Sequence, residues 1–368
     1  MNDKRLKPLG VIVVVVLLMS IAAAGCTTSQ TPTTSSTTTT VTDTLGRTVA
    51  VPYNITRIIT FNAVPPLNGL IMIFGMGNDI INNIPSSMAT MPQASFQYVL
   101  DPQLANEPQL GTTPNVEQIL SMKPDVVITS EQSTVTALQN SGIPVVCIQT
   151  NDVSQIEQSI SILGQLFHNS SRANEYIQYY NSKLAQLNAT IGSIPMSQRP
   201  TVLNMWATSM STWNESYWID PAGGRDALNT TGLIGGAGGV TSRITMTMEQ
   251  LLESNPDIII VRDASDIPYM ENNSQFSGIN AVKNKQIYVE PAGTFTWGGS
   301  AETPLMAEWA ASVFYPSKIS QSQLINDTIG FYKEFLGYNL STQQAQEMLH
   351  GMQNETYSTP YATPTPAA

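Results

Sequence analysis

Four of the five tryptophans lie where they could line a binding site: Trp206, Trp213, Trp218 and Trp297. Their segments follow short aliphatic runs of the kind that form buried strands, and aromatic side chains on such loops suit a large, flat or partly apolar ligand. For Trp206, at the end of a strand, a place in the core is the alternative. Tyr98 is a further candidate from a less regular segment, whereas Trp309 lies in an apparent helix and is expected to be core.

Two arginines are the cations closest to these segments. Arg262 directly follows the aliphatic run 257–261, and Arg225 follows the Trp218 segment. The chain has only 16 Lys and Arg in total, so an arginine at such a place suggests a partner for a ligand carboxylate or phosphate. A salt bridge to Asp263 or Asp266 is the alternative.

Histidine is too scarce to build a metal site or a catalytic set. His168 and His350 are the only two, and they lie far apart in the sequence. A carrier of free Zn²⁺ or Mn²⁺ ordinarily shows several His and carboxylate ligands, and no Ser/His/Asp, Cys/His or paired-carboxylate set is apparent. The sequence therefore argues against an enzyme and against an intrinsic cofactor, and it favours a metal that arrives already chelated. Ligation of haem by a methionine or tyrosine stays open.

Alternating strands and helices must position these residues. The predicted strands are 57–61, 125–129 and 143–148 in a first series, and 200–206, 257–261 and 285–291 in a second. This alternation predicts an α/β fold with mainly parallel sheets, in which ligands bind beyond the carboxyl ends of the strands. The expected lining segments therefore start at Phe61, Ser130, Trp206, Arg262 and Pro291.

One long helix is predicted between the two series. Apolar residues recur at helical spacing from Ala173 to Leu187, and neither glycine nor proline interrupts them before Gly192. About 20 helical residues span roughly 30 Å, which makes a stiff connector. We therefore expect two Rossmann-like α/β lobes, at 41–165 and 193–345, joined by a single helix at 166–192.

One phrase occurs twice. "NVEQILSMKPDVVI" begins at Asn115 and "TMEQLLESNPDIII" begins at Thr247. Both first residues are good N-caps with Gln three positions later, as in a capping box, and Pro-Asp then ends the helix before a strand. The expected buried face of each short helix consists of Val116, Ile119 and Leu120, and of Met248, Leu251 and Leu252.

These features together resemble the substrate-binding proteins of ABC importers for cobalamin, haem and ferric siderophores. The resemblance extends from Val41 to about Tyr315 and rests on "VTDTLGRTVAVPYNITRIITF", on the two repeated phrases, and on "AVKNKQIYVEPAG" followed by "PLMAEWAASVFYP". It implies two α/β lobes joined by a long helix, with the ligand held in the cleft between them. It also implies capture of a ferric siderophore, corrinoid or haem for delivery to an importer. An extracytoplasmic ligand sensor on the same fold is the alternative.

The resemblance also implies a role for Glu117 and Glu249, the glutamates of the two phrases. In the family these residues dock into arginine pockets on the transmembrane subunits, which are expected to form a homodimer. The alternative is that a glutamate in the first helical turn merely complements the helix dipole, an effect of about 0.3–1 kcal/mol.

The N-terminus predicts export and anchoring. Lys4, Arg5 and Lys7 precede the apolar run Val11–Ala24, which suits a signal peptide over residues 1–25 but is shorter than the roughly 20 residues of a membrane span. The small residues before Cys26 resemble a lipobox, so we expect lipidation of Cys26 and attachment to the outer face of the cytoplasmic membrane. An uncleaved anchor is the alternative.

The remaining segments and the net charge limit which parts of the chain can fold and which partners it can bind. A Thr/Ser-rich tether at 26–40 is expected to be a flexible spacer, and a C-terminal tail at 346–368 is expected to be disordered from Tyr357 onward. The net charge of −11 makes nucleic acid an improbable partner. Cys147 is expected to be a buried core thiol, and "IGGAGGVTSR" from Ile234 lacks the order of a P-loop and is interpreted as structural.

Overall fold

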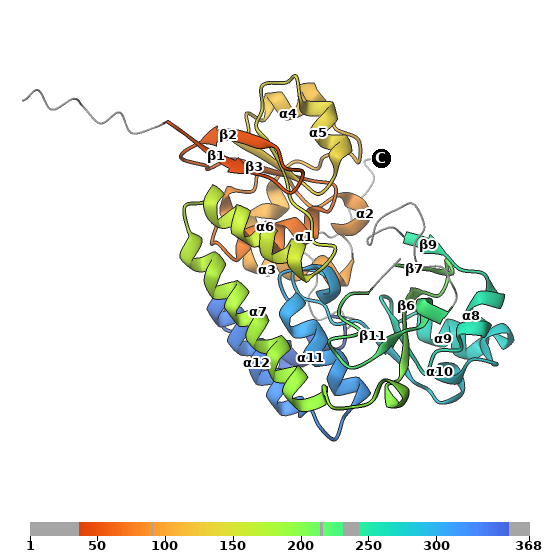
Figure 1. Cartoon of the computed structure of the whole chain (residues 1–368). Helices are drawn as coiled ribbons and strands as arrows, with labels where there is room; N and C mark the ends of the chain where they lie inside the picture. The colour runs from red at the N-terminus through yellow and green to blue at the C-terminus, as the bar shows by residue number, and fades with distance from the viewer. Residues whose placement is uncertain (1–36, 90, 214–215, 231–242, 353–368) are drawn as a thin grey trace, which may run out of the picture. The chain divides into compact units, whose positions relative to one another are not determined.

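The structure is a computed structural model that describes residues 37–89, 91–213, 216–230 and 243–352 (Figure 1). The predicted signal peptide and Cys26, most of the predicted tail, and the glycine-rich segment from Ile234 lie outside these residues. The strands are β1 (Thr38–Thr42), β2 (Thr48–Pro52), β3 (Ile58–Phe61), β4 (Val126–Thr129), β5 (Val145–Cys147), β6 (Thr201–Trp206), β7 (Ser211–Trp213), β8 (Arg225–Asp226), β9 (Arg243–Thr245), β10 (Ile258–Val261) and β11 (Ile287–Val289).

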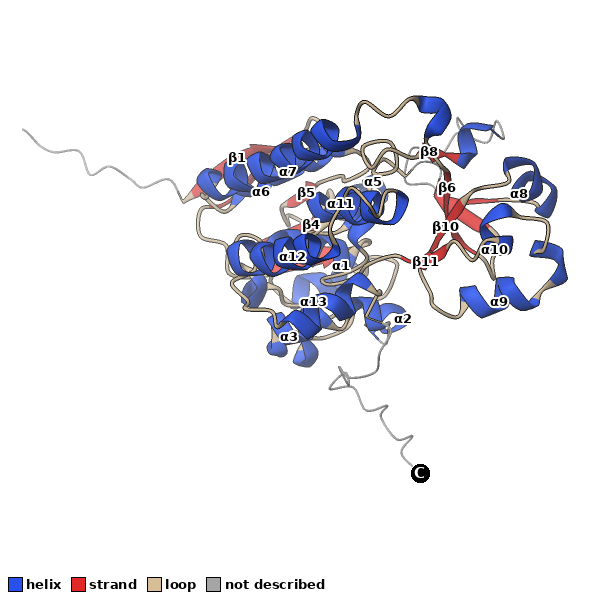
Figure 2. Cartoon of the chain, turned by 90° about the horizontal axis from the view of Figure 1, so that it is seen from below, coloured by secondary structure: helices blue, strands red, loops and turns tan. Residues whose placement is uncertain are grey.

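Helices alternate with these strands and cover the sheets (Figure 2). They are α1 (Val64–Met72), α2 (Ser86–Ala89), α3 (Phe96–Leu100), α4 (Val116–Ser121), α5 (Gln132–Leu138), α6 (Val153–Leu166), α7 (Ser170–Ile191), α8 (Met248–Ser254), α9 (Asp266–Asn272), α10 (Asn280–Lys283), α11 (Thr303–Phe314), α12 (Gln321–Phe335) and α13 (Thr342–Leu349). None of the described helices is long and apolar enough to cross a membrane.

The strands form one hairpin and two larger sheets. β1 and β2 pair antiparallel, and β3-β4-β5 form a parallel sheet. The six-stranded sheet has the order β11-β10-β6-β7-β9, with β8 also paired to β6. All six predicted strands are confirmed. The antiparallel strands β7 and β9 were not predicted, because three-residue strands are too short to show a period.

The parallel strands are buried on both faces, which explains their uninterrupted aliphatic sequences. In β10, Ile258 and Ile260 belong to a large core cluster that also contains Val126 and Ile128 of β4. Ile259, which points to the opposite face of the sheet, packs in a second cluster. Each of the two sheets therefore contributes one face to a shared core.

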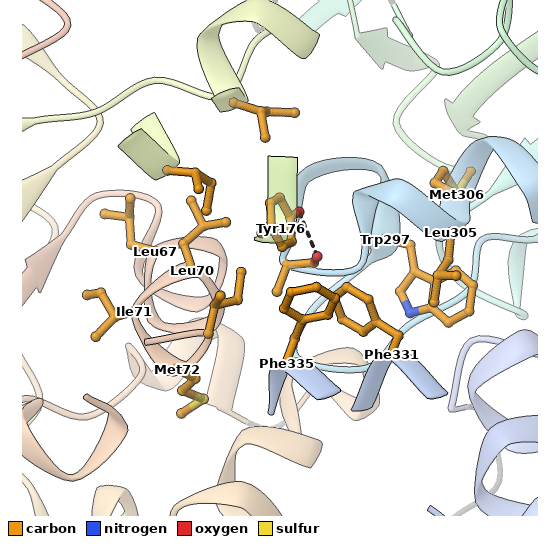
Figure 3. Close-up of a cluster of buried hydrophobic side chains, with 14 of the residues drawn as sticks. Leu67, Leu70, Ile71, Met72, Tyr176, Trp297, Leu305, Met306, Phe331 and Phe335 are labelled. Carbon is orange, nitrogen blue, oxygen red and sulfur yellow. Dashed lines mark hydrogen bonds between the residues drawn. The ribbon is translucent and has the colours of Figure 1, made fainter. Parts of the chain in front are cut away.

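The helix predicted over 166–192 is present as α7, which begins four residues later than predicted, and in chain order it lies between the two larger sheets. It runs alongside α11 and α12 (Figure 1). Lys183 of α7 lies 2.9 Å from the Glu308 carboxylate of α11 and 2.6 Å from the Asp327 carboxylate of α12. The Tyr176 hydroxyl donates to the Ala301 carbonyl at 2.8 Å (Figure 3). Polar contacts thus fix α7 against both neighbours.

Cys147 is fully buried in β5, as predicted for a core thiol. Burial raises the pKa of this thiol to about 11. Its side chain is therefore a packing element rather than a nucleophile.

Candidate functional site

A cavity of about 460 Å³ lies beyond the ends of several strands. All five segments that were predicted to follow strands contribute to its lining, through residues such as Asn62, Ser130, Trp213, Arg262 and Phe295. Their common position follows from the parallel sheets, whose carboxyl ends gather at one edge. The volume falls within the range of roughly 300–1,000 Å³ that is common for small-molecule sites.

Aromatic rings form much of the cavity wall. Trp213, Trp218, Tyr217 and Phe295 all line it. Trp218 is buried, whereas Trp213 is half-buried. The Tyr217 hydroxyl donates to the Gly298 carbonyl at 3.0 Å, which fixes the ring. These rings can stack on an apolar or planar ligand without a large loss of side-chain freedom.

The guanidinium of Arg262 lies among aromatic rings. Its carbon is 5.1 Å from the centroid of Trp206, 5.9 Å from that of Trp213 and 5.0 Å from that of Phe295. Trp206 and Trp213 meet edge to face, with their centroids 5.1 Å apart. Trp206 does not line the cavity itself but supports two side chains that do. Cation–π contacts of this kind hold a guanidinium at a defined position.

Arg262 is also tied to polar partners. Its Nε lies 3.8 Å from Oε2 of the buried Glu290, and its Nη2 donates to the Thr296 hydroxyl. The other oxygen of Glu290 accepts the Gly298 N–H at 2.8 Å. Burial lowers the pKa of Arg262, and the neighbouring Glu290 carboxylate acts in the opposite direction. The ion pair is therefore with Glu290, and not with either aspartate considered from the sequence.

Several lining residues escaped prediction. Gln149, Thr150 and Asn151 line the cavity directly after β5, although the rule used for the other strands would have selected them. Asn204 lies inside β6 and also lines the cavity. Its side chain is buried, and within the described part of the chain its Oδ1 has no hydrogen-bond partner. A position inside a strand gives no sequence signal for such a role.

Four predicted ligand-binding residues are not among those that line the cavity: Trp206, described above, and Trp297, Tyr98 and Arg225. Trp297 is fully buried in the core, beside Leu305 and Met306 (Figure 3). Tyr98 is buried in the same cluster. Arg225 pairs with Thr201 at the start of β6, the opposite end of that strand from Trp206.

Trp309 and His168 also lie outside the lining of the cavity. Trp309 is core, as predicted. The His168 ring stacks on Tyr53 with centroids 4.0 Å apart. Across the described residues, no group of three His, Cys, Asp or Glu side chains could hold a metal ion.

The two repeated phrases fold alike. Thr247 and Gln250 make both hydrogen bonds of a capping box, whereas Asn115 accepts only the Gln118 N–H, at 3.1 Å. Each helix is followed by a residue in the left-handed region, with φ of 49° at Lys123 and 37° at Asn255. Glu117 and Glu249 themselves lie exposed in the first turns of α4 and α8.

The aspartates of the phrases have equivalent contacts. The Asp125 carboxylate accepts the backbone N–H of Arg57 at 3.0 Å, just before β3. The Asp257 carboxylate accepts the backbone N–H and hydroxyl of Thr201 at 2.9 and 2.8 Å, at the start of β6. Each aspartate thus joins its own strand to the neighbouring parallel strand.

One prediction about the repeated phrases is wrong. Leu120 and Leu252 were expected on the buried faces of their helices, but they are 44% and 43% exposed. Ile119 and Leu251 are buried, as predicted. The helices have only six and seven residues, so few positions face the core: Ile119 in α4, and Leu251 and Ser254 in α8.

Comparison with known proteins agrees with this architecture. Residues 100–293, more than half of the chain, match the family described as "Periplasmic binding protein". The chain is 23% identical over 336 residues to the molybdate-binding protein MolA of Haemophilus influenzae, covering 80% of this chain and 90% of that protein. It is 24% identical over 198 residues to the iron-uptake system-binding protein of Bacillus subtilis, covering 51% of this chain and 62% of that protein.

Solved structures share the fold. A periplasmic solute binding protein from Veillonella parvula superimposes with a TM-score of 0.69 at 26% identity, covering 88% of this chain and 99% of that one. With the family match over more than half of its length, the chain belongs to the periplasmic binding protein family, the substrate-binding proteins of ABC transporters.

Proposed function

We propose that this protein captures a metal chelate, such as a ferric siderophore, a corrinoid or haem, and delivers it to an ABC importer. The observation that carries the proposal is Arg262, held among aromatic rings at the wall of a cavity of about 460 Å³. Such a wall offers stacking surface together with one fixed cation for an acidic group of the ligand.

The charge balance favours a chelate over a bare oxyanion. Two carboxylates, Glu131 and Glu290, line the cavity together with Arg262, and Glu290 already pairs with that arginine. A small dianion such as molybdate would meet this local negative charge at close range. A chelate spreads its charge and offers apolar surface to Trp213 and Phe295.

The side chain of Asn204 also favours a chelate over molybdate as the ligand. Its buried Oδ1 is an acceptor without a partner in the described structure, and an unpaired buried acceptor costs about 1–3 kcal/mol. A chelate that carries an N–H or O–H group can satisfy this oxygen, whereas fully ionised molybdate has no donor to offer.

The remaining parts of the proposal concern assembly. The two sheets serve as two lobes with α7 as their connector, and Glu117 and Glu249 dock the loaded protein on the transmembrane subunits, here taken to be a homodimer. Lipidated Cys26 holds the protein at the outer face of the cytoplasmic membrane. Support for docking comes from the exposure of both glutamates at equivalent places in two equivalent units.

A fluorescence titration tests the ligand class. Ferric siderophores, corrinoids, haem and molybdate are titrated separately into the purified protein, and quenching of tryptophan emission is recorded. Saturable quenching by one chelate, unaffected by excess molybdate, is the expected result. Binding of molybdate alone would show that the ligand is an oxyanion rather than a chelate. No response to any compound would refute the proposal.

Charge reversal tests docking. The double variant Glu117→Lys, Glu249→Lys is expected to bind ligand normally but to lose uptake in proteoliposomes that contain the importer, because like charges would then face each other. The matched control is Glu271→Lys with Glu334→Lys, two exposed glutamates outside the repeated phrases. Unchanged uptake by the first variant would show that these glutamates do not dock.

A further inference from the structure

Leu120 and Leu252 are unusual among the exposed side chains of this protein. Only six large hydrophobic residues of the described chain are more than about a third exposed, and these are two of them. They occupy the same position of the repeated phrase, since 252 − 120 and 249 − 117 both equal 132. A single exposed leucine is ordinary in a soluble protein, but a matched pair on two separate helices is not explained by chance exposure.

Each leucine lies on the same helical face as a glutamate. Leu120 follows Glu117 by three residues in α4, and Leu252 follows Glu249 by three residues in α8. Residues separated by three positions are neighbours on a helix surface. The chain therefore presents two copies of one small patch, in which a carboxylate stands beside an apolar side chain. We call these the Glu–Leu patches.

The patches are built on fixed local structure. Ile119 and Leu251, the residues directly before the two leucines, are buried and anchor the helices to the cores. The left-handed residues Lys123 and Asn255 end both helices at the same point. A partner therefore meets side chains whose backbone is already ordered, which lowers the entropic cost of association.

From this duplication we infer that Leu120 and Leu252 are apolar contacts of the importer-docking surface, and that they insert into two equivalent depressions on a partner made of two identical subunits. The inference rests on the proposed docking of Glu117 and Glu249. Charge complementarity requires a cationic group beside each depression. Neither glutamate has an ion-pair partner among the described residues, so both carboxylates are available to such a group.

Two copies of the same patch fit two copies of the same receptor site. Identical subunits related by a two-fold axis present identical surfaces. A partner whose two contact surfaces are unrelated would not be complementary to the same residue pair at both places. The glutamates would provide attraction that weakens with salt, and the leucines would provide contact area that does not.

Truncation of the leucines tests the inference. Leu120→Ala, Leu252→Ala and the double variant are compared with wild type for binding to the importer's transmembrane dimer in nanodiscs, at low and high salt. Alanine favours helix, so α4 and α8 should be retained, which circular dichroism and ligand titration verify. Each single variant should weaken binding about five-fold, because it removes one half-buried leucine contact. The double variant should weaken binding about 25-fold, because the effects of two distant sites multiply.

The salt dependence of binding separates the contribution of the leucines from that of the glutamates. The loss in the leucine variants should persist at high salt, whereas the effect of Glu117→Lys with Glu249→Lys should shrink. Met196→Ala is the control, since Met196 is 57% exposed and lies outside both patches. Wild-type affinity of the double leucine variant, with binding lost in the glutamate variant, would overturn the inference but leave docking intact. If the glutamate variant also bound normally, the proposed docking itself would be refuted.

Discussion

Arg262 and Glu290 follow neighbouring parallel strands, β10 and β11, and their side chains lie 3.8 Å apart at the cavity wall. The pair places a cation and an anion at a site that also contains aromatic rings. Since Glu290 is almost fully buried, its charge depends on Arg262 and on the Gly298 N–H for compensation. Removal of the arginine therefore affects both the ligand and the carboxylate.

Arg262→Met is expected to weaken binding of an acidic chelate by at least ten-fold. The substitution removes the cation that faces the ligand and leaves Glu290 without its ion pair. Arg262→Lys should recover only part of the affinity, because an ammonium group lacks the planar stacking surface. Isothermal titration calorimetry with the best chelate measures both variants.

Arg225→Met is the matched comparison for Arg262→Met. Arg225 lies at the opposite end of β6 from Trp206, where its Nε donates to the Arg199 carbonyl at 3.0 Å. We expect wild-type affinity in this variant. An equal loss of affinity in the two variants would mean that the ligand is not held by the cavity described above.

Trp213 is expected to report ligand binding. It lines the cavity, whereas Trp309 is buried in the core. Trp213→Phe should therefore remove a large part of the ligand-induced quenching, and Trp309→Phe should leave it unchanged. Steady-state emission at saturating ligand gives the comparison, and undiminished quenching in Trp213→Phe would place the ligand away from Trp213.

Gln97 is expected to position both sides of the cavity without touching the ligand. Its buried Nε2 donates to the Pro65 carbonyl at 2.7 Å and to the Thr294 carbonyl at 2.6 Å. Pro65 lines the cavity, and Thr294 directly precedes the lining residue Phe295. One amide thus joins the segment after β3 to the segment after β11.

Gln97→Leu should lower both stability and affinity. Loss of the amide leaves two buried carbonyls without this donor, and about 2–4 kcal/mol of unfolding free energy should be lost. Affinity should also fall several-fold at temperatures where the variant is fully folded, with faster hydrogen exchange near 65 and 294. Reduced stability with unchanged affinity would assign Gln97 a purely structural role.

The Lys183–Glu308–Asp327 group predicts a pH-dependent stability. Burial raises the pKa of Glu308 from 4.5 to about 7, despite the nearby Lys183 ammonium. The folded protein therefore binds a proton more tightly than the unfolded chain does. This contribution to stability is complete below about pH 4.5 and is lost as the pH rises through about 7.

Urea unfolding at pH 5 and pH 8 measures this effect. The free energy of unfolding should be lower at pH 8 by about 1–3 kcal/mol, and Glu308→Gln should remove that difference because the amide does not titrate. A difference of equal size in Glu308→Gln would assign the pH dependence to other groups.

The positions of the strands and the edge of the sheets that forms the cavity could be predicted from the sequence, because buried parallel strands have uninterrupted aliphatic sequences. The five post-strand segments followed directly from that pattern and one topological rule. Side-chain directions were less accessible. Trp297 and Trp213 look alike in sequence, yet a short 3-10 turn at Trp297–Gly299 buries the first in the core, while β7 brings the second to the cavity.

The errors on the repeated phrases have a similar cause. An apolar residue at helical spacing predicts a buried face, but α4 and α8 are too short for that face to extend over more than one turn. Leu120 and Leu252 therefore look like core residues in sequence and are exposed in the structure. Arg225 lies away from the cavity because β8 pairs with the start of β6, which no pattern in the sequence reveals.

The repeated unit continues beyond its exposed helix. Ser130 follows Glu117 by thirteen positions and Arg262 follows Glu249 by thirteen positions, and both later residues line the cavity. Each unit therefore begins at a Glu–Leu patch and ends at the lining of the cavity. We expect a ligand that draws Ser130 and Arg262 together to alter the distance between the two patches. An importer whose two docking sites lie at a fixed distance would then bind the loaded and the empty protein with different affinity.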